Sequence, residues 1–71
     1  MTRAELRSRL DREPFEPFRV HVTDGRHYDI RDPKLAVPTE NRLFIVFERD
    51  GFADVVLRHV TAIESIGNGA E

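Results

Sequence analysis

The sequence contains no cysteine, a single lysine and no long apolar run, and each absence narrows what the chain can be. Without cysteine, neither a disulfide nor a thiolate metal site can reinforce the fold. A single domain of 71 residues buries only about 60% of the surface that its unfolded chain exposes. Because such a core is marginal, we expect a homo-oligomer in which contacts between copies supply the additional burial.

No stretch approaches the roughly 18 consecutive apolar residues that a membrane-spanning helix needs. The first ten residues, MTRAELRSRL, carry charges at Arg3, Glu5, Arg7 and Arg9, where a signal peptide has an apolar segment. The absence of cysteine suits a reducing compartment. We therefore expect a cytoplasmic protein that has no membrane partner.

The formal net charge is −2 and the isoelectric point is near 5.9. These values argue against a uniformly basic nucleic-acid-binding domain, whose isoelectric point usually exceeds about 9. Ten of the eleven basic residues are nevertheless arginine, and the planar guanidinium suits recognition of phosphate or bases. We favour biased genomic composition as the explanation of the arginines, and local basic patches stay open as the alternative.

The N-terminal residues carry the signature of a helix start. Thr2 and Glu5 form a T-x-x-E capping box. Because a proline disfavours helical geometry in the residue before it, the sequence predicts a helix over residues 2–12. Leu6 and Leu10 lie four apart on one face and must dock on the rest of the protein, since so short a helix is not stable alone.

The segment FRVHVTDGRHYDI predicts a β-hairpin, because apolar and polar residues alternate on both sides of Asp24-Gly25. A two-residue turn would mix apolar and polar side chains on one face. We therefore predict a bulged turn of odd length, with Gly25 relieving the strain and Val22 opposite Tyr28.

The run RLFIVFE, which follows a proline-containing connection at residues 32–41, is the most β-prone in the chain. Its apolar residues point to both sides, so the strand is either central or meets a partner with one face. A second odd-length turn at Asp50-Gly51 leads into FADVVLR, and the same reasoning places Ile45 opposite Val55.

Two further pieces complete the chain: a short extended segment at residues 35–37, and a last strand, TAIESI, after a break at residues 58–60. Small β chains close or half-close into barrels, because an open sheet leaves exposed edges. We predict a mostly β fold (α+β by element count) in a single domain over residues 1–66. An N-terminal helix precedes a five-stranded antiparallel small barrel, Sm-like or SH3-like, and residues 67–71 form a disordered tail.

VVLRHVTAIESI resembles the second Sm motif of the bacterial Sm-like RNA chaperone Hfq, in which a Lys-His pair leads into the last strand. EPFRVHVTDGRHYDI is similar to the family's first hairpin. In that family the Lys-His pair lines the pore of a hexameric ring and contacts uridine-rich RNA. The resemblance makes Arg58 and His59 candidate RNA contacts, to phosphate and to a base respectively. It also implies a lateral RNA-binding rim, for which Arg7, Arg9 and Arg12 are candidates by type and region.

The chain departs from the Hfq pattern in its connection between strands two and three. That connection is longer here, contains Pro33 and Pro38, and lacks the Asp-x-Phe stretch of the family's nucleotide pocket. Glutamine is absent altogether, so the adenine-reading contacts of the family's distal face have no counterpart. Nearly the whole chain also resembles short uncharacterised bacterial proteins that share a helix, then P-F-x-P-F, then D-G-R, a likeness that implies no function.

In the predicted register His21, His27 and Asp29 share an outward face, and two imidazoles with a carboxylate can hold a metal. No fourth ligand accompanies them, so we interpret the group as a solvated polar face and expect neither a metal nor a cofactor. Ser8 and Ser65 have no recognisable catalytic partner. We therefore predict no catalytic residue and a protein that is not an enzyme.

Phe44, Val46 and Phe52 lie off the principal core face in the hairpin pattern. They either pack under the N-terminal helix or form an interface between subunits. The leading functional hypothesis is a self-associating small barrel that binds RNA. The alternative is a protein-interaction or structural module that has a protein partner and no nucleic-acid ligand.

Overall fold

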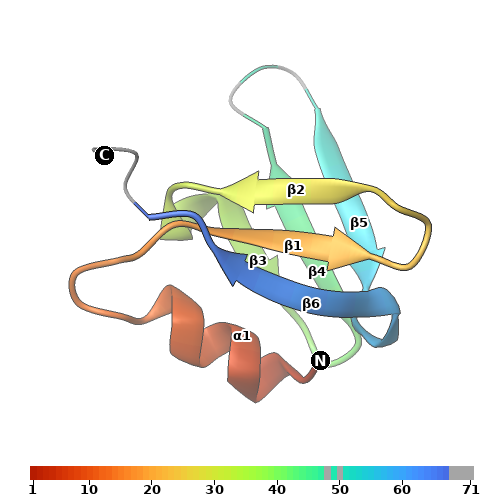
Figure 1. Cartoon of the computed structure of the whole chain (residues 1–71), viewed down its shortest axis with the longest axis horizontal. Helices are drawn as coiled ribbons and strands as arrows, with labels where there is room; N and C mark the ends of the chain where they lie inside the picture. The colour runs from red at the N-terminus through yellow and green to blue at the C-terminus, as the bar shows by residue number, and fades with distance from the viewer. Residues whose placement is uncertain (48, 50, 68–71) are drawn as a thin grey trace.

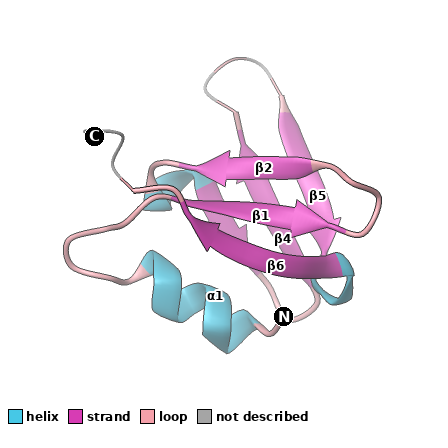
Figure 2. Ribbon diagram, viewed as in Figure 1, coloured by secondary structure: helices cyan, strands magenta, loops and turns pink. Residues whose placement is uncertain are grey.

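The computed structural model describes residues 1–47, 49 and 51–67, and these residues form a helix followed by six antiparallel strands in two sheets (Figures 1 and 2). The elements are α1 (Arg3–Leu10), β1 (Phe18–Val22), β2 (His27–Ile30), η1 (Pro33–Leu35), β3 (Ala36–Pro38), β4 (Arg42–Val46), β5 (Phe52–Val56), η2 (Leu57–His59) and β6 (Val60–Ser65). The predicted helix and mostly β chain are confirmed. The count of five strands is wrong, because the short extended piece after η1 pairs with β4 as a strand of its own.

Each sheet has three strands, in the orders β2-β1-β6 and β3-β4-β5. The strands of the first sheet run across those of the second in Figure 1, so the two sheets form separate layers. Within the described residues no strand pairing joins the two sheets, and the strands therefore do not close into a barrel.

The core lies between the inner faces of the two sheets. It is one cluster of buried side chains: Leu6, Leu10, Phe18, Val20, Ile30, Ala36, Leu43, Ile45, Val55, Leu57 and Val60. Helix α1 contributes the first two of these and packs beside β3, as the prediction that it docks on the sheets requires. Full burial of a side chain such as Phe18 stabilises the fold by about 1.5–3 kcal/mol.

The capping box at the start of α1 is confirmed. Thr2 Oγ1 accepts from the Glu5 amide at 3.2 Å, and Glu5 Oε1 accepts from the Thr2 amide at 2.9 Å. The hydrogen bonds that the Thr2 amide and the Thr2 hydroxyl donate to the Glu5 carboxylate lower the pKa of that carboxyl. The helix ends at Leu10, two residues before the predicted end, because Asp11 leaves helical geometry while its amide closes the last turn on the Arg7 carbonyl at 2.9 Å.

The first hairpin has the predicted odd-length turn, but the predicted register is wrong by two residues. Tyr28 lies opposite Val20 instead of Val22. The Val22 amide donates to the Arg26 carbonyl at 3.0 Å, which leaves a three-residue loop that ends at Gly25 with φ +92°. A shift of two residues preserves side-chain parity, so the predicted faces are correct although the partners are not.

The second hairpin differs from its prediction in the same way, because Ile45 lies opposite Ala53 instead of two residues further along β5. The Phe47 amide donates to the Gly51 carbonyl at 3.0 Å. Gly51 has φ +148°, and a Cβ there would lie 3.3 Å from the Phe47 ring, so both backbone geometry and space favour glycine. The Phe47 ring stacks on Tyr28 with 6.3 Å between centroids.

Part of the sequence prediction lies outside the described residues, namely Asp50 of the second turn and residues 68–71 of the predicted tail. Among the residues that the structure describes, no helix has the length and apolar character that a membrane crossing demands.

Candidate functional site

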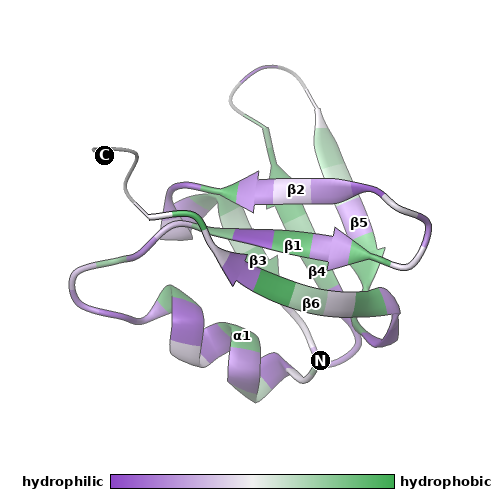
Figure 3. Cartoon of the chain, in the orientation of Figure 1, coloured by the Kyte–Doolittle hydropathy of each residue, from purple (hydrophilic) through white to green (hydrophobic). Residues whose placement is uncertain are grey.

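The outer face of the β3-β4-β5 sheet is apolar and exposed to solvent. We call it the apolar face; it comprises Val37, Phe44, Val46, Phe52 and Val56, together with the charged residues Arg42 and Asp54. Phe52 is 67% exposed, Val37 50% and Val46 46%. Figure 3 shows the hydrophobic colouring of β4, the central strand of this sheet.

Strand β4 creates this face because both of its sides are apolar. Leu43 and Ile45 point into the core, which sends Phe44 and Val46 outward. Phe52 on β5 lies directly opposite Val46, so the three predicted interface residues do share one face. The alternative that they pack under α1 is wrong, because Val46 and Phe52 are largely exposed and none of the three belongs to the buried cluster that contains the helix leucines.

The sequence prediction missed Val37 and Val56, which complete the apolar face. Val37 lies opposite Phe44, and Val56 lies opposite Arg42. The signal for Val37 was weak, because it sits in a three-residue strand between Ala36 and a proline.

One ion pair crosses the apolar face. Arg42 Nη1 lies 3.0 Å from Asp54 Oδ2, on the diagonal between neighbouring positions of β4 and β5. The two side chains are 51% and 37% exposed. This surface therefore combines apolar side chains with one cation and one anion.

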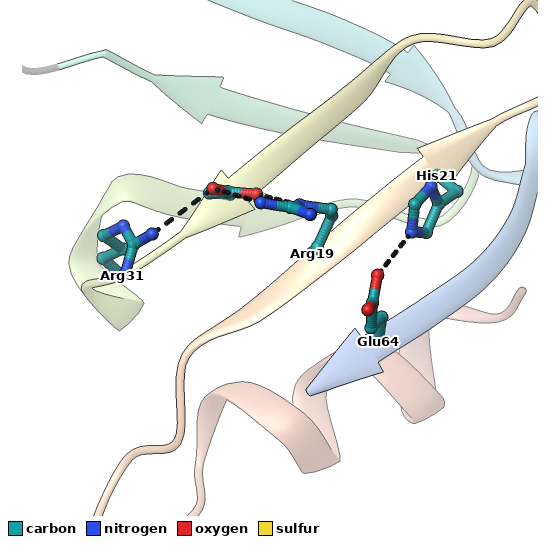
Figure 4. A network of polar contacts seen from close by, with 5 residues as sticks. Arg19, His21, Arg31 and Glu64 are labelled. Carbon is teal, nitrogen blue, oxygen red and sulfur yellow. Dashed lines mark hydrogen bonds and ion pairs between the residues drawn. The ribbon is translucent and has the colours of Figure 1, made fainter. Parts of the chain in front are cut away.

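The outer face of the β2-β1-β6 sheet has the opposite character, because charged side chains from all three strands pair across it (Figure 4). Arg19 donates to both carboxylate oxygens of Asp29, at 2.7 and 3.2 Å, and Arg31 donates to the same carboxylate at 3.4 Å. Next to them His21 Nε2 lies 2.9 Å from Glu64 Oε1. We call this the polar face.

The pairing on the polar face shifts two carboxyl pKa values. The hydrogen bonds from Arg19 lower the pKa of Asp29, and the hydrogen bond with His21 lowers the pKa of Glu64. His21, His27 and Asp29 do share this face as predicted, but His21 lies opposite His27, and Asp29 lies opposite Arg19. No group of three or more potential metal ligands gathers anywhere in the described part of the chain.

Arg58 and His59, the candidate RNA contacts, lie exposed on the short helix η2. Backbone hydrogen bonds hold η2 from two sides. The Leu57 amide donates to the Asn41 carbonyl at 2.8 Å, and the His59 carbonyl accepts from the Thr23 amide at 2.9 Å. The turn is therefore a fixed platform for these two side chains.

A groove of about 480 Å³ lies between η2, the start of α1 and the start of β4. We call it the arginine groove; it is lined by Met1, Thr2, Arg3, Glu40, Asn41, Arg42, Val56, Leu57 and Arg58. Arg3 and Arg58 against Glu40 leave a small local excess of positive charge, because the third arginine, Arg42, pairs with Asp54. Arg58 lines the groove and His59 does not, and sequence reasoning missed Arg3 and Arg42 because they come from distant segments.

Arg7, Arg9 and Arg12, the predicted rim residues, do not line this groove, although Arg3 of the same helix does. Arg7 lies 3.8 Å from Asp11, Arg12 pairs with Glu16, and Arg9 donates to Ser65 Oγ at 3.4 Å. Each of the three thus has a partner within its own chain. Arg7, Arg9 and Arg12 therefore remain together on or near α1, apart from Arg58 and His59 on η2.

No protein-family model, curated protein or solved structure that was compared with the chain matches it. The geometry of the apolar face and of the arginine groove therefore carries the functional proposal.

Proposed function

We propose that this chain is a non-enzymatic protein-binding module that associates with itself through the apolar face. The observation that carries the proposal is the exposure of Phe52 and Val46, which lie side by side on neighbouring strands. Contiguous apolar surface rimmed by polar residues is typical of protein interaction sites. Burial of that surface is favourable by about 25 cal/mol for each Å² removed from water.

The small size of the domain favours self-association over the alternative that the apolar face has no binding partner. Among the described residues, eleven buried apolar side chains form the core of a 71-residue chain that has no cysteine. Domains of this size are marginally stable, and association of copies adds buried apolar area without enlarging the chain.

The finer fold description that we propose is a half-open barrel of the Sm-like or SH3-like kind. In support, the chain passes from β2 through η1 into β3, so that a short connection joins an edge strand of the first sheet to an edge strand of the second. The short helix η2 then returns the chain from β5 in one sheet to β6 in the other.

The first experiment compares two aspartate substitutions on opposite faces by sedimentation velocity over a concentration series. Val46→Asp introduces a charge into the apolar face, whereas Ala62→Asp introduces the same charge on the polar face, where Ala62 is exposed opposite His21. We expect the native protein and Ala62→Asp to associate as concentration rises, and Val46→Asp to stay a folded monomer, because a buried unpaired carboxylate is costly. A native protein that is monomeric at every concentration, or a Val46→Asp variant that associates normally, would refute the proposal.

A second candidate function is RNA binding, which the arginine groove favours. Arg58 lies there with Arg3 and Arg42, and arginine is the side chain best suited to phosphate. His59, the residue after Arg58 on the same short helix, is exposed, so its ring is available to a base. The ion pairs of Arg7 and Arg12 weigh against a rim on α1, because each pair would have to open before a phosphate could bind.

The RNA hypothesis is tested with an oligouridine RNA in a titration at several salt concentrations. Replacing Arg58 and His59 by alanine is expected to weaken binding and to reduce the slope of log affinity against log salt by about 0.7, the value for one lost phosphate contact to a single strand. Arg31→Ala is the matched control, since Arg31 is an exposed arginine that directly follows β2 and does not line the groove. Equal affinity of the native protein and the double variant removes these residues from RNA binding.

A further inference from the structure

We propose that two copies of the chain pack their apolar faces together about a two-fold axis that runs diagonally across the face, past Phe44 and Val56. The inference rests on the proposed function, because it names the partner of the same surface and the arrangement in which that partner binds. It is carried by the positions that the strand register gives to the seven residues of the face.

The register lays these residues out in three rows across the sheet. Arg42 lies opposite Val56 in the first row, Phe44 lies between Val37 and Asp54 in the second, and Val46 lies opposite Phe52 in the third. The line from Phe44 to Val56 is one diagonal of this lattice. Arg42 and Asp54 lie on the two sides of that line, as the ends of the crossing diagonal.

A two-fold rotation about this diagonal exchanges the two sides of the line. It brings Arg42 to Asp54 of the partner subunit, and Asp54 to Arg42 of the partner subunit. Phe44 and Val56 lie close to the axis and meet their own counterparts, while Val46 comes beside Val37 of the partner subunit. The strands of the two packed sheets then cross steeply, as in the orthogonal class of sheet packing.

The charges identify the partner as a second copy. A wholly apolar partner would cover Arg42 and Asp54 without providing either of them with a new partner, and buried charges with incomplete pairing are costly. A second copy provides one cation and one anion at the positions that the rotation requires. The intrachain pair at 3.0 Å then becomes part of a group of four charges in which the signs alternate.

The dimensions of the face limit the strength of the dimer. Three strands about 4.8 Å apart and five residues of about 3.3 Å rise give a patch of roughly 10 by 17 Å. A surface of this size is smaller than that of standard specific interfaces, so the association is expected to be weak or transient. We therefore expect a dissociation constant between the high micromolar and the millimolar range.

The test exchanges the two charges one at a time. In a dimer of the Arg42→Asp variant, each of the two contacts between position 42 of one copy and position 54 of the other brings two carboxylates together. In a dimer of the Asp54→Arg variant, each of these contacts brings two guanidinium groups together. Each variant alone is expected to dimerise at least about tenfold more weakly than the native protein, because like charges in an interface repel. An equimolar mixture of the two variants restores opposite charges at both contacts, so it is expected to form a heterodimer with nearly native affinity.

The result that overturns the two-fold arrangement is a mixture that binds no more tightly than either variant alone. Circular dichroism and thermal melting of each variant check the fold, which an exposed ion pair supports only slightly. If either variant fails to fold, a short bismaleimide cross-linker provides the second test, since the native chain has no cysteine. We expect it to join Val56→Cys to itself and to leave Ala62→Cys monomeric; the reverse pattern, or no cross-linking of either, contradicts the arrangement.

The two proposals fail in distinguishable ways. A native protein that never associates defeats both of them. If Val46→Asp abolishes association while the charge-exchange mixture shows no rescue, self-association through the apolar face stands and the two-fold arrangement is wrong.

Discussion

The polar face and the apolar face are the outer surfaces of two sheets that share one core, yet they are built in opposite ways. On the polar face Arg19 and Asp29 pair at 2.7 Å, and His21 lies 2.9 Å from Glu64. On the apolar face Phe52 extends into solvent with 67% of its surface exposed. The charges of the first surface are paired within the chain, whereas the apolar side chains of the second gain burial only from another molecule.

The difference shows that the side chains of an exposed sheet face can all be satisfied within the chain, or can remain in need of burial by a partner. A paired, hydrated face has little to gain from contact with another protein, because its ion pairs would lose water on burial. An exposed aromatic side chain loses nothing of that kind when it is covered. This contrast is the reason why we propose the outer face of the β3-β4-β5 sheet, and not that of the other sheet, as the binding surface.

The largest expected effect is on stability, and it distinguishes the inner side of β4 from its outer side. Leu43→Ala truncates a side chain with 0% exposure on the inner face and is expected to destabilise the domain by about 2–5 kcal/mol. Val46→Ala, on the outer side of the same strand, is expected to change stability of the dilute monomer by no more than about 0.5 kcal/mol. Urea unfolding of both variants measures the difference, and equal losses would mean that Val46 belongs to the core.

An intermediate effect is expected on the affinity of self-association when the side chain of Phe52 is removed. Phe52→Ser is expected to weaken self-association by about tenfold, because a large anchor is lost from the interface. Arg26→Ser, a change to another exposed side chain in the β1–β2 turn, is the matched control and should leave association unchanged. Analytical ultracentrifugation of the three proteins decides; equal affinities would exclude Phe52 from the contact.

The smallest effect is expected on the polar face, and it depends on pH. Because Arg19 lowers the pKa of Asp29 below its ordinary value of 3.8, the folded state favours the carboxylate. The resulting stabilisation is complete above that ordinary value and is lost as the pH falls through the lower pKa of the folded state.

Asp29→Asn removes this stabilisation, so its thermal midpoint is expected to lie a few degrees below that of the native protein at about pH 6. The two midpoints should converge as the pH falls below the ordinary pKa of an aspartate. Self-association of the variant at about pH 6 is expected to be native. A midpoint difference that persists unchanged in acid would show that the ion pair with Arg19 does not stabilise the fold.

Sequence patterns predicted the faces of the fold better than its pairings. The alternation in β1 and β4 determines which side chains point inward, and that parity survives a shift of two residues. The tightness of each turn depends on local backbone geometry at positions such as Gly25, which alternation does not encode. For this reason Val20 has Tyr28 as its partner, although the sequence placed Val22 there.

The candidate surfaces were predictable to different degrees. Phe44, Val46 and Phe52 follow from strand parity and lie together as expected. The arginine groove was not predictable beyond Arg58, because its members come from three separate segments that meet only in the fold. The acidic partners of Arg7 and Arg12 lie four residues along the chain, where helix geometry and a turn bring them close.

The most direct measurement is a dilution series of two-dimensional ¹H–¹⁵N NMR spectra of the native protein, which locates self-association without any substitution. The apolar-face proposal predicts that amide shifts change with concentration in β3, β4 and β5, with the largest changes around Phe44 and Val46. The amides around Arg19 and Glu64 are expected to stay constant. Changes centred on the β2-β1-β6 sheet, or spectra that are identical up to about millimolar concentration, where weak interfaces of this size associate, would contradict it.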